Sequence, residues 1–481
     1  MAPRTFLCDV PRCCGDLRNV VKTVAGIPED HKGQINIVIN DEDFNTIARA
    51  FIILTYLLYH DDVAEATENA IHLWYSFCIP SSIDGWMRES LVEFVREEIR
   101  LNNKGSENEN VDRLFWDELG LDCRGTVVRK ELAPISISLD MPRQHWYRLE
   151  GYLLRESNWK MCKSARESIV LTENRRDYRE QYLFRQPSRE RPSHMAFKYD
   201  GILKPFGREL FYYNTPNLTL FDGSRGVYEW LIDDTKGPER GWSRSEFKKM
   251  STGLAKNDIL GKLYYYLQDL LSTFHARMRT LNIHFFLEYG PLHLMDQILK
   301  RKTFDRILLP EENLHPYIVA DIAHWPSEFF NPRNHHATLI TPIKLSSLGS
   351  MKLPTHDSRR HLGAILSNNP SVPLPRDLYT SAPLFNPREL ILRETFSRNE
   401  ECAQELMSPC LSKDVSYGFL FAKWDTNDNV RKKAVNDIVE MWPYLPDKYP
   451  SERNKDLICE DRYPTVKYVE WNGPLPPTGS C

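Results

Sequence analysis

The sequence lacks the cysteine pattern of a structural metal site. It contains ten cysteines but no Cys-x-x-Cys pair, and Cys13 and Cys14 are adjacent. Because a structural zinc site needs paired, regularly spaced ligands, the sequence predicts none. Free thiols are typical of a reducing compartment, so we expect the protein to be cytoplasmic.

Long apolar runs are also missing. The longest, AFIILTYLLY (Ala50 to Tyr59), has about half the length of a membrane span. The first residues, MAPRTFLCDVPRCC, are too interrupted by polar residues and proline for a signal peptide. We therefore expect no membrane partner. The net charge of −4 argues against a generic nucleic-acid coat, although it leaves room for a local basic face.

Glycine is scarce where a cofactor loop would need it. The stretch CCGDLRNVVKTVAG (Cys13 to Gly26) has the form of a loop entering a helix. It offers one glycine, Gly15, where the dinucleotide fingerprint has three. Asp16 beside it either caps the helix or contacts a substrate. With no metal cluster and no complete fingerprint, the sequence predicts that no cofactor is required.

What is present is an alternation of strands and helices. The chain has 481 residues, of which 41% are hydrophobic, so two or three domains and a large core are expected. Strand, loop, helix and a strand ending in an acid indicate an α/β protein with a Rossmann-like parallel sheet. The expected strands are Arg4–Val10, Ile35–Asp41, Leu281–Gly290 and Thr303–Pro310, and the expected helices are Leu17–Ala25, Asp43–Tyr59 and Asp61–Phe77.

Four regions follow from this pattern. We expect a Rossmann-like N-terminal half (1–130), a basic insertion (131–278), a continuation of the sheet (279–345) and a C-terminal extension (346–481) with a helix over Val430–Trp442. The insertion contains Arg175, Arg176 and Arg179 among aromatic residues. Such a pattern suits phosphate contacts and base stacking in RNA, or an ordinary solvated face.

The start of the third expected helix is acidic. Asp61, Glu65, Glu68 and His72 follow one another at spacings of four, three and four, so they share one helix face. Three carboxylates in a stripe could bind a guanidinium or ammonium group, or transfer protons.

A structural alternative exists for each of these acids. Asp62 and Glu65 fit a capping-box variant, and His72 fits a surface or satisfied histidine. Asp41 closes the second strand, where Rossmann folds hold a ribose hydroxyl and where helix caps are equally common.

Several of these segments together resemble an N-terminal module of uncharacterised function. The segments are CCGDLRNVVKTVAG, INIVINDEDFNTIARAFIILTYLL and ENAIHLWYSF, and the module is found in many fungal proteins and in axonemal dynein assembly factors. Within that group, Asp61-Asp62-Val63-Ala64-Glu65 is similar to the Asp-Asp-x-x-Glu motif of fungal arginine-containing cyclodipeptide synthases.

The resemblance implies an enzyme that condenses arginyl-tRNA with a second aminoacyl-tRNA, as the first step of a fungal secondary-metabolite pathway. It implies catalytic roles for Asp61, Asp62 and Glu65. Asp16, Asp41, Glu68 and His72 are then candidate substrate-binding residues, Arg175, Arg176 and Arg179 candidate tRNA-binding residues, and no stable protein partner is expected.

Two other functions remain open. The kinship with dynein assembly factors implies a non-catalytic scaffold that binds a protein partner. A strand, glycine loop, helix and acidic strand end also suit an S-adenosylmethionine-dependent methyltransferase, although a single glycine beside Cys13 and Cys14 makes a poor cofactor loop.

Overall fold

A computed structural model gives the architecture of the chain. It describes residues 4–9, 17–104, 124–128, 135–156, 158–209, 211–222, 228–232, 237–290, 303–309, 329–331, 333–344, 431–433 and 466–472. Asp16, most of the region 346–481 and the Gly15 loop lie outside these residues.

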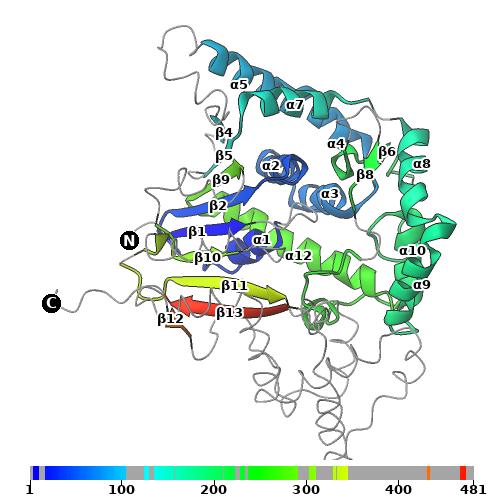
Figure 1. Cartoon of the computed structure of the whole chain (residues 1–481). Helices are drawn as coiled ribbons and strands as arrows, with labels where there is room; N and C mark the ends of the chain where they lie inside the picture. Colours follow the sequence, from blue (N-terminus) through cyan, green and yellow to red (C-terminus); the bar gives the residue numbers. More distant parts are fainter. Residues whose placement is uncertain are drawn as a thin grey trace, which may run out of the picture.

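A nine-stranded sheet forms the centre of the protein, in the order β12-β13-β11-β10-β1-β2-β9-β5-β4 (Figure 1). The pairs from β11 to β5 are all parallel, whereas β4, β13 and β12 are antiparallel to their neighbours. These strands are β1 Arg4–Asp9, β2 Ile35–Asp41, β4 Arg124–Val128, β5 Ile135–Asp140, β9 Ile283–Tyr289, β10 Arg306–Leu308, β11 Thr338–Lys344, β12 Arg431–Lys432 and β13 Val466–Asn472.

The first three predicted helices are confirmed in position. They are α1 Arg18–Ala25, α2 Phe44–Tyr59 and α3 Val63–Tyr75. Every residue of α2 from 44 to 58 is buried, because the helix packs on β2, β5 and β9 and is covered by α3. This burial explains the apolar run of the sequence. Among the described residues, no helix is both long and apolar enough to cross a membrane.

The remaining helices surround this centre. They are α4 Ser81–Trp86, a π-helical turn Met87–Leu91, α5 Val92–Lys104, α7 Arg143–Leu154, α8 Trp159–Val170, α9 Arg176–Arg185, α10 Arg191–Asp200, α11 Arg244–Phe247 and α12 Ile259–Thr280. Short 3-10 turns cover Glu173–Arg175 and Leu218–Leu220, and small two-stranded sheets pair β3 Cys78–Ile79 with β6 Thr215–Pro216 and β7 Phe221–Asp222 with β8 Glu229–Trp230.

The region 131–278 contacts the main body of the protein through elements at both of its ends. Its first strand, β5, lies in the large sheet between β9 and β4. Its last helix, α12, packs against α1, α2 and α3. Between them, α8, α9 and α10 form a column on the right-hand side of Figure 1. The boundary at 131 falls between β4 and β5, which pair with each other.

One helix prediction is wrong at its start. Within the stretch Val430–Trp442, Arg431 and Lys432 form strand β12, which pairs with β13 (Val466–Asn472) at the edge of the sheet. Residues 434–442 lie outside the described part. Arg431 and Lys432 form a strand despite the helical pattern, because the edge of β13 offers them backbone hydrogen-bonding partners from a segment distant in sequence.

Candidate active site

The acidic motif begins helix α3. The side chain of Asp62 accepts a hydrogen bond from the backbone N–H of Glu65 at 2.9 Å, so Asp62 is the N-cap. Asp61 precedes it and accepts a hydrogen bond from the Arg279 guanidinium of α12 at 3.2 Å. The capping interpretation is therefore confirmed for Asp62, while Asp61 ties the start of α3 to α12.

Glu65 is the member of the motif that stays available. It lies in the first turn of α3, where a carboxylate suits the helix dipole. Its side chain is exposed and makes no hydrogen bond or ion pair with another described residue. The carboxylate is therefore free to meet a ligand.

A groove of about 680 Å³ opens beside this helix start. Its volume lies in the usual range for small-molecule sites, about 300–1,000 Å³. Three segments line it, from α3, from the start of α4 and from the loop before β6: Asp62, Ala64, Glu65, Glu68, Asn69, Pro80, Ser82, Gly207, Arg208, Glu209, Tyr212 and Tyr213.

The charge of the groove is predominantly negative. Its described lining carries four carboxylates, Asp62, Glu65, Glu68 and Glu209, against one guanidinium, that of Arg208. Several carboxylates that line one groove favour a cationic ligand, because each carboxylate forms stronger hydrogen bonds with a positively charged donor. Of the predicted stripe of Asp61, Glu65, Glu68 and His72, only Glu65 and Glu68 line the groove, and Asp62 joins them there.

Glu68 already has a cationic partner inside the protein. Its Oε1 accepts a hydrogen bond from Arg208 at 2.5 Å and another from the Tyr213 hydroxyl at 3.1 Å. Arg208 also donates to the Tyr264 hydroxyl at 2.7 Å and stacks over that ring. These contacts hold Arg208 and Tyr213 beside Glu68, whereas the exposed Glu65 side chain has no such partner among the described residues.

The two tyrosines that contact Glu68 and Arg208 remain protonated at ordinary pH. Burial, followed by the nearby Glu68 carboxylate, raises the pKa of Tyr213 to about 12 and raises that of Tyr264 further. Tyr213 is thus a hydrogen-bond donor to Glu68, and the phenol of Tyr264 accepts from Arg208. Neither phenol can serve as a base at neutral pH.

His72 lies behind the groove rather than in its lining. Its ring is fully buried against that of Tyr213, with the ring centroids 4.4 Å apart. Nδ1 lies 2.8 Å from the Ser76 hydroxyl, and Nε2 lies 3.9 Å from Glu68 Oε1. Burial, together with the charge of Arg208, lowers the pKa of His72 to about 3. The imidazole is therefore neutral, and its approach to Glu68 is not an ion pair.

Buried neutral histidines predict a pH dependence of stability. Burial also lowers the pKa of His194 to about 3, with Arg244 and Lys198 adding to the effect. Between pH 6.5 and 3 the unfolded chain binds protons that the folded chain refuses, so stability falls as the pH falls through this window. We expect a slope of up to roughly 1.4 kcal/mol per pH unit for each histidine, measured by urea unfolding.

Two matched variants test how much His72 contributes to this pH dependence of stability. His72→Gln should remove about half of that slope, whereas replacing the exposed His335 by Gln should leave it intact. A slope as steep in His72→Gln as in the unchanged protein would contradict the prediction, because it would show that folding does not shift the pKa of His72.

Asp41 is not part of this groove. It is the last residue of β2, nearly fully buried, and its Oδ1 accepts a hydrogen bond from the Asp43 backbone N–H at 2.7 Å. Asp43 in turn caps α2. Since α2 has 16 residues, its length of about 24 Å separates Asp41 from the acidic motif that follows its other end. Asp16 lies outside the described residues.

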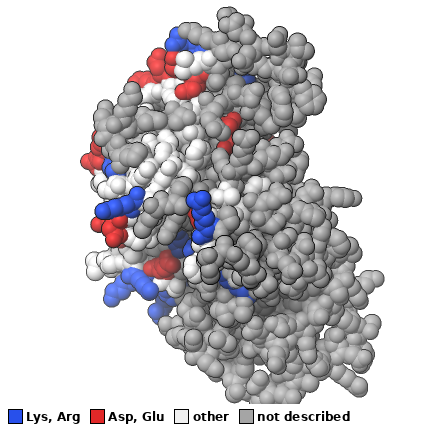
Figure 2. Space-filling model, turned by 90° about the vertical axis from the view of Figure 1, so that its left-hand side faces the viewer, with Lys and Arg blue, Asp and Glu red and all other residues white. Residues whose placement is uncertain are grey.

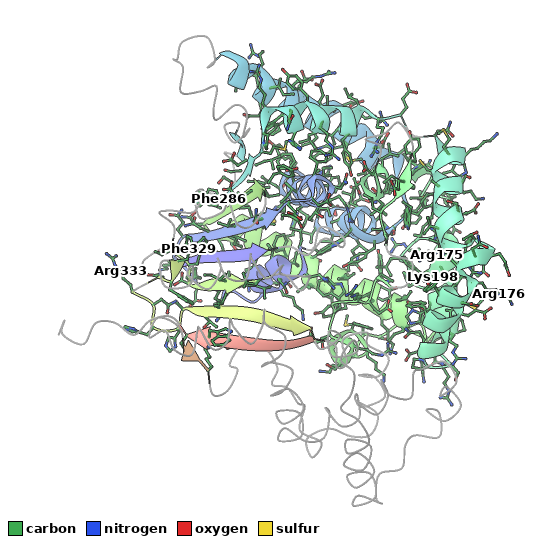
Figure 3. The ribbon with its side chains drawn as sticks, viewed as in Figure 1. Arg175, Arg176, Lys198, Phe286, Phe329 and Arg333 are labelled. Carbon is green, nitrogen blue, oxygen red and sulfur yellow. The ribbon has the colours of Figure 1, made fainter. Side chains whose placement is uncertain are left out.

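The predicted RNA-binding arginines lie at the start of α9. Arg176 pairs with Glu173 and Glu180, and Arg179 donates to the backbone carbonyls of Val170 and Thr172. Arg175 stacks over the Tyr178 ring at 4.8 Å. In Figure 3, Arg176 lies on the outer side of the helix column.

The face of the molecule opposite these arginines can be compared with them for its charge. On the face opposite the α8–α10 column, positive and negative side chains are interspersed over the described part (Figure 2). The contacts above show that Arg179 binds backbone carbonyls and that Arg176 is paired with two carboxylates, so an RNA phosphate would have to compete with these partners.

We expect Arg175→Ala with Arg176→Ala to weaken RNA binding and to flatten its salt dependence. Each phosphate contact that is lost should reduce the slope of log affinity against log salt by about 1. The measurement is tRNA affinity across a salt series, with Arg96→Ala on α5 as a matched exposed arginine. An unchanged affinity and slope in the double variant would place the RNA contacts elsewhere.

Sequence reasoning missed half of the groove. Arg208, Tyr212 and Tyr213 come from a loop more than a hundred positions after α3, and no local pattern links the two segments. Ser82 follows the acidic motif closely in the sequence. The structure separates it from Ser76, because Ser82 lines the groove and Ser76 is buried in hydrogen bonds with His72 and Leu203.

Comparison with known proteins gives a single result. Residues 6–79 are similar to DUF4470, a domain of unknown function. The matched residues include β1 from Phe6 onward, β2 and the whole acidic motif, but not the groove residues from Pro80 onward. No curated protein and no solved structure matches the chain. Within the described residues, no group of three or more potential ligands is placed to hold a metal ion.

Proposed function

We propose that the protein is a tRNA-dependent cyclodipeptide synthase, which condenses arginyl-tRNA with a second aminoacyl-tRNA. The observation that carries the proposal is the groove, in which Glu65 and Asp62 are among the acids that line a space of about 680 Å³. Such a space has the size and charge for a cationic aminoacyl group.

The parallel order of β10, β1, β2 and β9, with α2 returning across the sheet, supports a Rossmann-like class for the core. In that class, ligands usually bind at the carboxyl ends of the strands. The groove instead lies beyond the end of α2, outside that position. The proposal therefore rests on the groove itself and not on the fold.

The chemistry needs positioning and proton transfer more than activation. The α-amine of one aminoacyl group attacks the ester carbonyl of the other, an amide forms, and the ester C–O bond breaks. The released tRNA hydroxyl takes a proton. A second attack within the dipeptidyl ester closes the ring and releases the second tRNA. Two reactants held together can gain several orders of magnitude in rate from orientation alone.

The groove offers residues for each of these needs. Glu65 can take the proton from the attacking ammonium group or bind the guanidinium of the arginyl side chain. The Arg208 guanidinium, held by Glu68 and Tyr264, supplies a fixed positive charge near a developing oxyanion. The Ser82 hydroxyl is placed in the groove should an acyl-enzyme form.

Expression in a microbial host tests the proposal. The cells supply charged tRNAs, so mass spectrometry of the medium should detect arginine-containing diketopiperazines. Cells that carry a Glu65→Gln variant serve as the control. A methyltransferase would instead gain thermal stability with S-adenosylmethionine, and a scaffold would give no product while binding a protein partner stably.

A further inference from the structure

Two large aromatic side chains stand exposed at the rim of the groove. Phe211 and Tyr212 are 62% and 64% exposed, and their ring centroids lie 3.9 Å apart. Tyr212 also lines the groove, so the pair lies next to its acidic lining. Exposed aromatic surface of this kind contributes nothing to the core and is typical of a binding site.

The loop that carries the pair is held on both sides. Before it, the backbone N–H of Phe206 donates to Asp258 Oδ2 at 2.7 Å, and Arg208 binds Glu68. After it, the Tyr213 hydroxyl binds Glu68 at 3.1 Å, and β6 pairs with β3. These contacts present the aromatic pair from a braced loop. Bracing lowers the entropic cost of binding a flat ligand.

We propose that Phe211 and Tyr212 form a stacking platform for the 3′-terminal adenine of a tRNA. This proposal rests on the proposed function, because it places the nucleotide that carries the aminoacyl ester. The end of a tRNA is single-stranded, and unpaired bases are commonly bound by stacking on aromatic side chains. With the base on Tyr212, the attached amino acid extends into the groove towards Glu65.

The charges around the platform agree with this orientation. The carboxylates of the groove attract the ammonium and guanidinium groups of an arginyl ester, whereas they repel phosphate. Stacking on the rim keeps the phosphates outside the groove and lets only the amino acid pass among the acids. A platform of neutral aromatics therefore suits this place better than one of basic residues.

Fluorescence of a modified RNA tests the platform without any catalysis. The probe is an uncharged RNA hairpin with a tRNA-like single-stranded 3′ end, in which 2-aminopurine replaces the terminal adenine. Stacking on an aromatic ring should quench its fluorescence on addition of the protein. Tyr212→Leu should reduce the quenching and weaken binding roughly tenfold, while Tyr212→Phe should retain both.

Matched variants distinguish the loss of a stacking ring from a folding defect. Tyr147→Leu removes an exposed tyrosine of α7 and should leave quenching unchanged. Phe211→Leu is the second platform variant and should show the same direction of change as Tyr212→Leu. With charged tRNA, the platform variants should raise KM and leave kcat nearly unaltered, since the ring does not touch the reacting atoms.

The outcomes distinguish this inference from the proposed function. Quenching that depends on Tyr212 in a protein that makes no diketopiperazine would keep the platform and overturn the enzyme. Product formation with identical quenching and KM in Tyr212→Leu and Phe211→Leu would overturn the platform and keep the enzyme. If either variant instead converts a dimer to a monomer without changing RNA binding, the pair is a protein interface and the inference is wrong.

Discussion

Glu65→Gln is expected to lower cyclodipeptide formation by at least a hundredfold. That factor is the low end for loss of a general acid or base. The change keeps the shape of the side chain and removes its charge. Product from purified protein and charged tRNAs, measured with thermal unfolding on the same preparation, checks the expectation.

The structure explains why stability should not change. Asp62 is the residue that caps α3, and its bond is to the backbone N–H of Glu65, which the substitution leaves intact. The Glu65 side chain is exposed, so it supports no packing. A loss of product at constant melting temperature therefore reports on chemistry or binding.

Glu93→Gln provides the control for this experiment. Glu93 is an exposed acid in the first turn of α5, as Glu65 is in α3, but it does not line the groove. It should retain normal activity. Normal product from Glu65→Gln as well would leave the motif with a capping role alone.

Asn217→Ala is expected to cost about 3 kcal/mol or more of unfolding free energy. The amide of this fully buried residue donates to the carbonyls of His72, Leu73 and Ser76, at the end of α3. The substitution removes all three bonds and leaves the buried Ser76 carbonyl without this donor, which alone costs about 1–3 kcal/mol. The His72 carbonyl still accepts from the Ser76 backbone N–H, and the Leu73 carbonyl from the Thr219 hydroxyl. Urea unfolding measures the loss, with Asn214→Ala as an exposed asparagine that should change stability by less than about 0.5 kcal/mol.

The same burial bears on the sequon formed by Asn217, Leu218 and Thr219. The asparagine side chain is enclosed and hydrogen-bonded, so glycosylation would require local unfolding.

A loss of much less than 1 kcal/mol in Asn217→Ala would contradict the stability prediction. It would indicate that water replaces these hydrogen bonds and that the end of α3 is less rigid than the bonds imply.

The sequence predicted those parts of the fold whose signal is local. The β-branched, apolar run INIVIND predicted β2, and the longer apolar run after Asp43 predicted α2, because both signals lie within one short segment of the sequence. The sequence also predicted the acidic start of α3, because this signal too lies within a few residues. Of its two interpretations, the cap is confirmed for Asp62, and the ligand site stays a proposal for Glu65.

What remained hidden depends on pairing between distant segments. The place of β5 between β9 and β4 and the strand at Arg431 follow from partners far away in sequence, which local patterns do not encode. The groove has the same origin, since Arg208 and Tyr212 meet α3 only in the folded chain. His72 was placed on the acidic face by helical spacing, but the loop before β6 covers that face and buries it.

Reconstitution from purified components tests the central claim most directly. The protein is mixed with tRNA already charged with isotope-labelled arginine and with a second charged tRNA, in EDTA and without ATP. The account predicts a labelled cyclic dipeptide, since the aminoacyl ester carries the driving force and the sequence predicts no cofactor. Recovery of the label only as arginyl-tRNA and free arginine, from folded protein that binds the tRNA, would contradict it.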